Sequence, residues 1–230
     1  MDRYILASQS PRRRELLHLV LNDYEVIPAR GEEIVRSTDP AEVVKELSLQ
    51  KAMEVAKGLR PCQGDRMIVI GADTVVAVDG EILGKPADHA DAARMIGMLQ
   101  GREHHVFTGV TVCSVEHTDS IGKDDRDADS FAAAEEETDP QKGASFICTQ
   151  GPLEIRYFSF SEETAVDVYP MNRGEIEGYV SLKEPYDKAG AYGIQGAFSI
   201  FIRGIRGDYN NVVGLPAARL YHELAAHGLL

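Results

Sequence analysis

The sequence predicts a mixed α/β fold, and three features of the chain lead to this prediction. Short apolar segments rich in β-branched residues alternate with longer segments whose apolar residues recur at helical spacing. Gly, Pro and Asp separate these segments, as they do at turns and helix caps. Of the 230 residues, 43% are hydrophobic, which is enough for the core of one large domain or two small lobes.

Two strands and two helices are expected before the Asp79-Gly80 pair, which itself predicts a tight hairpin turn. They are a strand at Tyr4–Ala7, helices at Pro11–Val20 and Pro40–Gly58, and a strand at Met67–Val78. The inward-facing residues of the two helices are expected at helical spacing, namely Leu16, Leu17 and Val20 in the first and Val43, Val44, Leu47, Ala52, Val55 and Ala56 in the second.

The rest of the chain continues the alternation of helices and strands. Asp88 is placed to cap a helix that runs to about Gln100, and Gly101 marks its C-terminal end. The further expected elements are strands at Val106–Val115, Leu153–Tyr169 and Phe198–Ile205, a short helix at Arg173–Ser181, and a last helix that begins at Pro216.

Residues 116–150 differ in composition from the rest of the chain. From Glu116 to Asp139 there are ten acidic residues, against Lys123 and Arg126, and one aromatic residue, Phe131. Such a stretch has too little apolar surface to offset the entropy lost on ordering. We therefore interpret 116–150 as an acidic, low-complexity surface insertion between two strands, and a mobile loop rather than a domain.

The charge and cysteine content limit the class of protein. A net charge of −13 argues against a general nucleic-acid binder, although one basic pocket for a small anion remains compatible with it. Cys62, Cys113 and Cys148 form neither a disulfide framework nor a zinc pattern, which is typical of a reducing compartment. No apolar run approaches the roughly 18 residues of a membrane span, and no signal peptide is recognisable, so we expect a cytoplasmic protein.

The segment from Ser8 to Arg14 has the pattern of an anion site at a helix N-terminus. Ser10 suits the N-cap and Pro11 the first helical position, so three arginines fall in the first turn. Cations there are unfavourable by about 0.3–1 kcal/mol each because of the helix dipole. They become favourable when an anion is bound beside the free backbone N–H groups. At about 100° per residue the three arginine side chains fan out, so one of them is expected to face solvent. The alternative is an ordinary exposed helix start.

Asp73 interrupts the apolar strand at Met67–Val78 and is the strongest candidate for chemistry. Asp is depleted in strands, and a buried carboxylate needs a partner, a metal ion or a proton. A general base or a magnesium ligand fits this position, and Gly71 would let a ligand approach the backbone. The structural alternative is an Asp at a bulge or at a strand end.

Other charged residues and one glycine-rich segment could complete a phosphate site. Lys51, Lys85, Glu32 and Glu33 are each more typical of a solvated surface, but with Asp73 and Arg13 they form a set suited to phosphate and magnesium. The segment 184–196 brackets Gln195 with glycines, and its side chain offers a donor and an acceptor for a base edge. A structural loop is the alternative there, and a packed or surface role is expected for His104 and His105.

Taken in order, these motifs resemble those of the Maf family of nucleoside triphosphate pyrophosphatases over nearly the whole chain. The matching segments are 6–17, 71–76, 84–86, 108–110, 187–196 and 207–216. The resemblance implies an elongated, two-lobed α/β fold with a mixed sheet and a central cleft (Maf/ITPase-like), here one domain over 1–230. It also implies a homodimer, a divalent cation (Mg²⁺ or Mn²⁺), and hydrolysis of a nucleoside triphosphate to the monophosphate and pyrophosphate in nucleotide-pool house-cleaning.

The resemblance also assigns roles by position. Asp73 looks like the proton acceptor, Asp73 and Glu33 like metal ligands, and Glu33 is preferred over the adjacent Glu32. The substrate-binding and specificity positions are Ser8, Arg13, Thr74, Gln195, Lys51 and Lys85. The arginines after Pro11, the pair Asp73-Thr74 and the segment Ile194-Gln195-Gly196 resemble the motifs of the family branch that prefers dTTP and UTP. The acidic insertion and the third arginine, Arg14, depart from the family pattern.

Two other classes of protein remain as alternatives. A catalytically silent, nucleotide-binding regulator of cell division would bind dTTP or UTP without releasing pyrophosphate. The intact Asp73, Lys51 and Lys85 argue against it. A nucleotidyltransferase would instead leave the nucleotide on an acceptor. The products formed from a nucleoside triphosphate separate all three.

Overall fold

A computed structural model describes residues 2–117, 135–139, 143–150 and 153–230. Its elements are β1 (Asp2–Leu6), α1 (Pro11–Leu17), β2 (Glu25–Val26), α2 (Pro40–Gly58), β3 (Arg66–Val78), β4 (Glu81–Leu83), α3 (His89–Leu99), β5 (Glu103–His117), β6 (Glu135–Asp139), β7 (Gly143–Gln150), β8 (Leu153–Val168), α4 (Arg173–Val180), 3₁₀ turns η1 (Glu184–Asp187), η2 (Ala189–Ala191) and η3 (Ala197–Phe201), β9 (Ile202–Arg206), α5 (Tyr209–Val213) and α6 (Ala217–Ala226).

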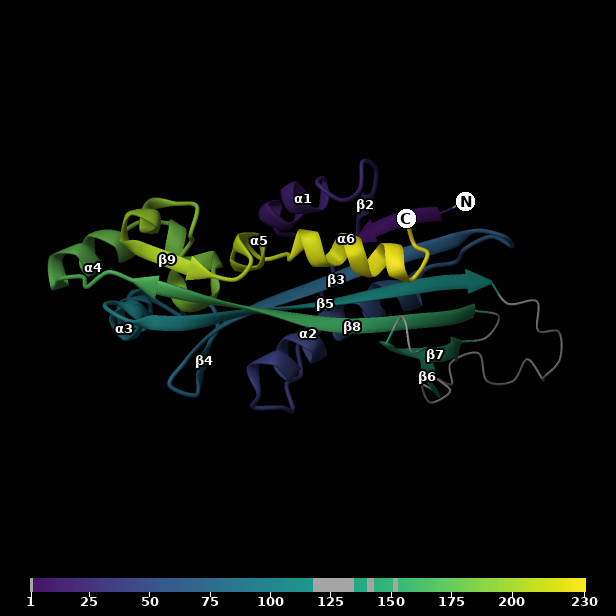
Figure 1. Cartoon of the computed structure of the whole chain (residues 1–230), viewed down its shortest axis with the longest axis horizontal. Coiled ribbons are helices and arrows are strands. Elements are labelled where there is room, and N and C mark those ends of the chain that lie inside the picture. The colour runs from purple at the N-terminus through teal and green to yellow at the C-terminus, as the bar shows by residue number, and fades with distance from the viewer. Residues whose placement is uncertain (1, 118–134, 140–142, 151–152) are drawn as a thin grey trace.

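In the part of the chain that the structure describes, nine strands form one mixed sheet, which runs the length of an elongated molecule (Figure 1). Its main path has the order β2-β1-β3-β5-β8-β7-β6, with β4 beside β3 and β9 beside β8. The long strands β3, β5 and β8 are antiparallel neighbours, whereas β1 pairs with β3 in parallel. This architecture confirms the predicted α/β fold with a mixed sheet. The description of 1–230 as one domain of two lobes remains our proposal.

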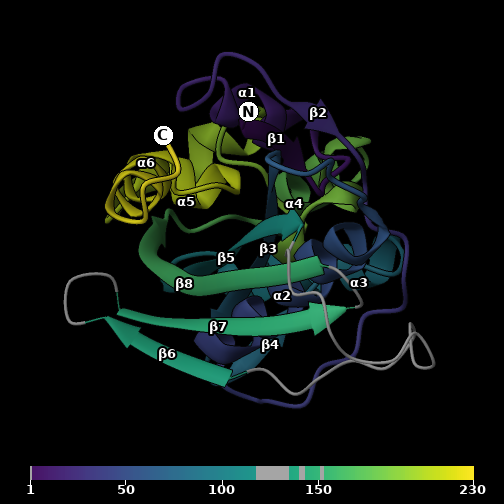
Figure 2. The same cartoon turned by 90° about the vertical axis from the view of Figure 1, so that its right-hand side faces the viewer.

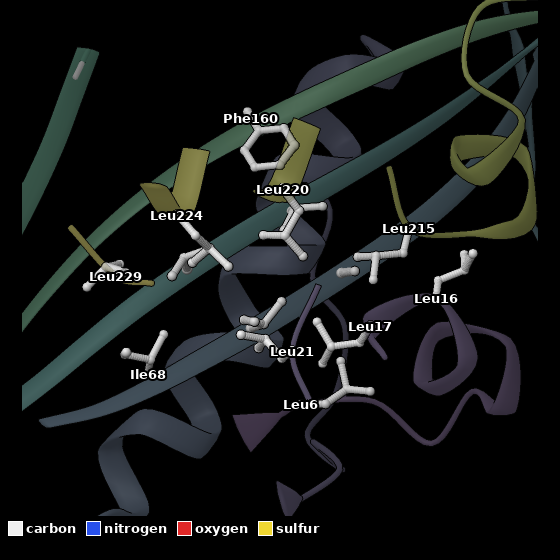
Figure 3. Close-up of a cluster of buried hydrophobic side chains, with 14 of the residues drawn as sticks. Leu6, Leu16, Leu17, Leu21, Ile68, Phe160, Leu215, Leu220, Leu224 and Leu229 are labelled. Carbon is white, nitrogen blue, oxygen red and sulfur yellow. The ribbon is translucent and has the colours of Figure 1, made fainter. Parts of the chain in front are cut away.

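Helices cover both faces of the sheet. The helix α2 packs on one face, and its predicted inward residues are all buried. On the other face, Leu16 and Leu17 of α1 and Leu220 and Leu224 of α6 belong to one buried cluster (Figure 3). A separate core around α3, α4 and the 3₁₀ turns lies at the end of the molecule that is opposite to the N-terminus (Figure 1). Within the described residues, no helix is long and apolar enough to cross a membrane.

Most predicted element boundaries agree with the structure to within a few residues. The first helix is shorter than predicted, because the chain after Leu17 continues in turns with backbone bonds from Leu19 to Leu16 and from Val20 to Leu17. Asp88 caps α3 as predicted, and the turn between β3 and β4 has positive φ at both Asp79 and Gly80. These φ values are those that a tight hairpin turn requires.

Two predictions of secondary structure are wrong. The segment 116–150 was expected to be a loop, but β6 and β7 pair with each other and β7 pairs with β8, so they extend the sheet (Figure 2). The acidic stretch 118–134 lies outside the described residues and stays a prediction. The strand expected at Phe198–Ile205 starts only at Ile202, because the preceding apolar residues form η3 and bury Phe198.

Two glycines let α2 approach the sheet closely. A Cβ on Gly71 would lie 2.5 Å from the carbonyl oxygen of Ser48, and one on Gly109 would lie 2.2 Å from that of Val44. Both distances are far below van der Waals contact, and the atoms in the way belong to helix backbone. The interpretation of Gly71 as a place where a ligand approaches the backbone is therefore wrong, since α2 occupies that space.

We expect Gly109→Ala to lower the free energy of unfolding by about 3 kcal/mol, the upper end of the usual cost of overpacking. The added methyl group must push α2 away from β5, because the backbone of Val44 cannot rotate aside. Urea unfolding measures the change. Gly97→Ala is the matched control, since a Cβ at this position in α3 meets nothing within 4 Å and Ala favours a helix. An unchanged urea midpoint for Gly109→Ala would contradict this packing.

His104 is a buried titratable group, in agreement with the packed role expected from sequence. Its Nε2 lies 2.7 Å from the hydroxyl of Tyr192, and its side chain is inaccessible to solvent. Burial, with a smaller contribution from the charge on His105, lowers the pKa of His104 from 6.5 to about 3. The folded protein therefore holds this imidazole neutral.

This histidine should make the fold sensitive to mild acid. His104 takes up a proton near pH 6.5 in the unfolded chain but stays neutral in the folded chain. Its contribution to the free energy of unfolding is therefore fully present above pH 6.5 and is lost as the pH drops toward about 3. The expected loss from this group is about 2 kcal/mol between pH 6.5 and pH 5. Urea unfolding of wild type and His104→Gln at both pH values isolates it. Equal pH slopes would show that His104 is not held neutral.

Candidate functional site

The site lies beside a stretch of β3 that has a strand neighbour on one side only. Pairing of β3 with β1 ends at Ile70, and pairing with β4 begins at Val76. Among the described strands, only β5 pairs with the residues between them, 71–75. A cavity of about 350 Å³ opens there and is lined by Asp73 and Thr74 together with α1, α2 and the segment 187–196. The sheet therefore presents Asp73 at an open edge.

The cavity is positive, although the whole chain is acidic. Five basic side chains line it, namely Arg12, Arg13, Lys51, Lys85 and Lys188, against the three carboxylates of Glu33, Asp73 and Asp187. The chain as a whole carries a net charge of −13. A local excess of cations in a concave site attracts a small polyanion, even when the protein as a whole is negative. The geometry fits a phosphate-bearing ligand.

Arg13 is fixed in one orientation by three acceptors. Ser10 caps α1 as predicted and places Arg13 in the first turn. The guanidinium then donates to the carbonyl oxygen of Gly214 at 2.8 Å, to the Thr74 hydroxyl at 3.0 Å and to the Ser8 hydroxyl at 3.4 Å. Burial lowers the pKa of Arg13, and the charge of Asp73 opposes this shift. Within the described residues, Arg13 has no carboxylate ion-pair partner, so its charge is available to an anion.

Lys51 connects the two carboxylates that the sequence pointed to. It projects from α2, and its Nζ lies 3.0 Å from Glu33 Oε1 and in direct contact with Asp73 Oδ1. The side chains of Asp73 and Lys51 are 14% and 18% exposed, whereas that of Glu33 is 53% exposed. Asp73 is therefore a largely buried carboxylate whose partner is an ammonium group. Of the three predicted ways to stabilise such a carboxylate (a partner, a metal ion or a proton), the structure shows the first.

The other predicted residues also surround this cavity. Lys85 and Gln195 are exposed and line it, and Glu33 rather than Glu32 reaches it. Ser8 is buried and lines an adjoining hollow that shares Arg12, Arg13, Lys51 and Lys85 with the main cavity. The structure thus brings all the predicted residues into one neighbourhood.

Comparison with known proteins places the chain in a family. The sequence pattern of the family described as Maf-like protein matches residues 3–138 and 136–227. The chain belongs to the Maf-like protein family. Similar proteins include the dTTP/UTP pyrophosphatase of Agathobacter rectalis, which is 43% identical over 100% of this chain and 99% of its own length. Those of Carboxydothermus hydrogenoformans (43%, over 97% of each chain) and Bacillus cytotoxicus (40%, over 97% of this chain and 95% of its own) carry the same name.

Three further residues line this Maf-like cavity, namely Arg12, Asp187 and Lys188, which lie in the predicted anion-site and glycine-rich segments but received no individual role from the sequence. Arg12 forms an ion pair with Asp187 at 3.1 Å, so η1 and the start of α1 meet at the cavity. Lys188 donates to the carbonyl oxygen of Glu184 and to Asp187. Arg14 is exposed, as expected for one of three arginines that fan out around a helix.

The donor set of the Maf-like site fits a divalent cation that is shared with a phosphate ligand. Asp73 and Glu33 supply carboxylate oxygens to one ammonium group, Lys51 Nζ, so these oxygens already gather around a positive charge. Within the described residues, no group of three or more His, Cys, Asp or Glu side chains forms a metal cluster. Mg²⁺ commonly takes only one or two carboxylates and completes its shell with water and substrate phosphate oxygens.

Proposed function

We propose that this chain is a nucleoside triphosphate pyrophosphatase that hydrolyses dTTP and UTP to the monophosphate and pyrophosphate. The observation that carries the proposal is the cation-rich cavity around the Lys51-bound carboxylate of Asp73. The names of the relatives, which align over nearly the full chain, support the choice of substrate. Modified pyrimidine nucleotides belong to the same substrate class, so the proposed role is house-cleaning of the nucleotide pool in the cytoplasm. A homodimer remains part of the proposal.

In the proposed mechanism, Asp73 accepts a proton from the water that attacks the α-phosphorus. The Lys51 ammonium orients the Asp73 carboxylate, and the rigid edge of β3 fixes its position. A bond forms between the water oxygen and the α-phosphorus, and the bond to the bridging oxygen of pyrophosphate breaks. General-base assistance of this kind contributes roughly 10²–10⁴-fold to the rate.

The cationic side chains stabilise the charge that develops on the leaving pyrophosphate. Lys51, Lys85 and Arg13 come from α2, the β4–α3 connection and α1, so they approach the phosphates from different elements. Asp73 and Glu33 would hold Mg²⁺ or Mn²⁺, which when bound would neutralise phosphate charge. The proposed determinants of nucleotide choice are Arg13, Thr74 and Gln195, which also line the cavity.

A panel of nucleoside triphosphates, assayed with and without Mg²⁺ or Mn²⁺, tests this function. We expect equal amounts of monophosphate and pyrophosphate, fastest from dTTP and UTP, and little turnover without the divalent cation. Binding of dTTP without release of pyrophosphate would instead indicate the silent regulator. A nucleotide attached to an acceptor would indicate a transferase. Either result would contradict the proposal.

A further inference from the structure

A chain of buried hydroxyl and amide groups lies behind the Arg13–Thr74 wall of the cavity. Thr74 and Thr108 are direct partners in the β3–β5 ladder, and their hydroxyl oxygens are 2.9 Å apart. Thr108 is inaccessible to solvent, and its hydroxyl lies 3.0 Å from the carbonyl oxygen of Asn211 in α5. This chain connects the cavity wall to a helix that follows it by more than a hundred residues in the sequence.

Several buried hydrogen bonds hold the end of this hydrogen-bonded chain that lies farthest from the cavity. The side-chain nitrogen of Asn211 donates to the carbonyl oxygen of Val106 at 3.1 Å and to the hydroxyl of Thr164 at 2.9 Å. Thr164 in turn donates to the carbonyl oxygen of Asp208 at 3.0 Å. Asn211 and Thr164 are both inaccessible to solvent. The carbonyl oxygen of Asn211 is therefore held in place for Thr108.

The acceptors in this chain determine which hydroxyl donates to which. A carbonyl oxygen only accepts, so the single proton of the Thr108 hydroxyl goes to Asn211. Between the two hydroxyls, Thr74 must then be the donor and Thr108 the acceptor. Thr74 also accepts a bond from Arg13 at 3.0 Å, and a guanidinium never accepts. The proton of Thr74 is thus committed to Thr108, and one lone pair remains free.

We infer that Thr108 is a positioning residue that makes Thr74 a pure hydrogen-bond acceptor toward the bound nucleotide. This inference rests on the proposed function and adds a rule of selectivity to it. An acceptor attracts a donor of the ligand and disfavours its carbonyl and phosphate oxygens. Outside the phosphates, dTTP and UTP share two donors, the imide N3–H of the base and the 3′-hydroxyl of the sugar. Thr74 would accept a hydrogen bond from one of these two donors.

Thr108→Val tests the inference, because it removes the hydroxyl and keeps the shape of the side chain. The hydroxyl of Thr74 is then free to rotate and donate, so it no longer discriminates against an acceptor. The assay compares kcat/KM for dTTP with dCTP, which lacks the imide N–H, and with dideoxy-TTP, which lacks the 3′-hydroxyl. We expect the preference for dTTP over one of these analogues to fall about tenfold, the size of one hydrogen bond. The analogue affected identifies the donor.

Thr111→Val is the matched control. Thr111 lies on the same strand and is equally buried, but its hydroxyl bonds to Ser48 and Ser159, on the face that α2 covers. Thermal unfolding measures any loss of stability that the two variants share. The kcat/KM ratios of Thr111→Val should stay at the wild-type values. If Thr108→Val keeps both wild-type ratios, the inference is wrong.

A second variant covers the case in which Thr108→Val does not fold. Thr74→Val removes the acceptor itself at a site that is only half-buried, and it should lower the same ratio. Wild-type ratios in Thr74→Val would overturn the inference. Failure of the proposed function has a different signature, because the wild-type protein would then release no pyrophosphate from any of the three nucleotides.

Discussion

Asp73→Asn should lower kcat for dTTP hydrolysis by about 10³-fold while the fold stays intact, within the usual range for loss of a general base. Asn has the shape of Asp and retains an oxygen for Lys51, but its amide cannot take a proton from water. The substitution keeps the size of the side chain at a position that borders the cavity, so the thermal unfolding temperature should change little. Initial rates of pyrophosphate release with saturating dTTP and Mg²⁺ measure the effect.

Asp167→Asn serves as the control for this substitution. Asp167 lies on β8 of the same sheet, where it pairs with Arg203 on the surface and does not line the cavity. Its activity should equal that of the wild type. If Asp73→Asn hydrolyses dTTP near the wild-type rate, Asp73 is not the base.

Lys51→Met should cost about 10²-fold in kcat/KM, comparable with removal of one preorganised donor at a site of developing charge. Lys51 Nζ touches both Asp73 and Glu33, so its loss leaves two carboxylates facing each other without the cation that orients them. The site also loses a positive charge for the phosphates. The measurement is kcat/KM for dTTP over a range of Mg²⁺ concentrations.

Lys45→Met separates this effect from a general effect on α2. Lys45 lies on the same helix and is partly buried, but its partner is Glu42 in the first turn of the helix. Activity should be unchanged in this variant. Equal losses in the two variants would mean that Lys51 acts through the stability of the helix alone.

The sequence predicted the framework because its local signals agree with the tertiary structure. Asp39 and Asp88 cap α2 and α3, and the apolar spacing of α2 matches the face that packs on the sheet. Asp73 was recognisable because a carboxylate in an apolar strand requires a partner. Spacing alone could not identify that partner, since Lys51 comes from another element and reaches Asp73 only when α2 lies on β3.

Other features depend on packing that local patterns do not encode. The acidic residues of β6 resemble a solvated loop, and only pairing with β7 makes the segment a strand. Phe198 has strand propensity but is buried among aromatic rings by η3. Gly71 was interpreted as an approach for a ligand because sequence cannot show that the backbone of α2 lies against it. The Arg12–Asp187 pair joins segments that are distant along the chain.

Hydrolysis of dTTP in water enriched in oxygen-18 shows which phosphorus atom the water attacks. In the proposed mechanism the water attacks the α-phosphorus, beside Asp73, so mass spectrometry should find one heavy oxygen in dTMP and none in pyrophosphate. The same experiment with Asp73→Asn should yield little of either product. Heavy oxygen in pyrophosphate, or release of inorganic phosphate with dTDP, would contradict attack at the α-phosphorus.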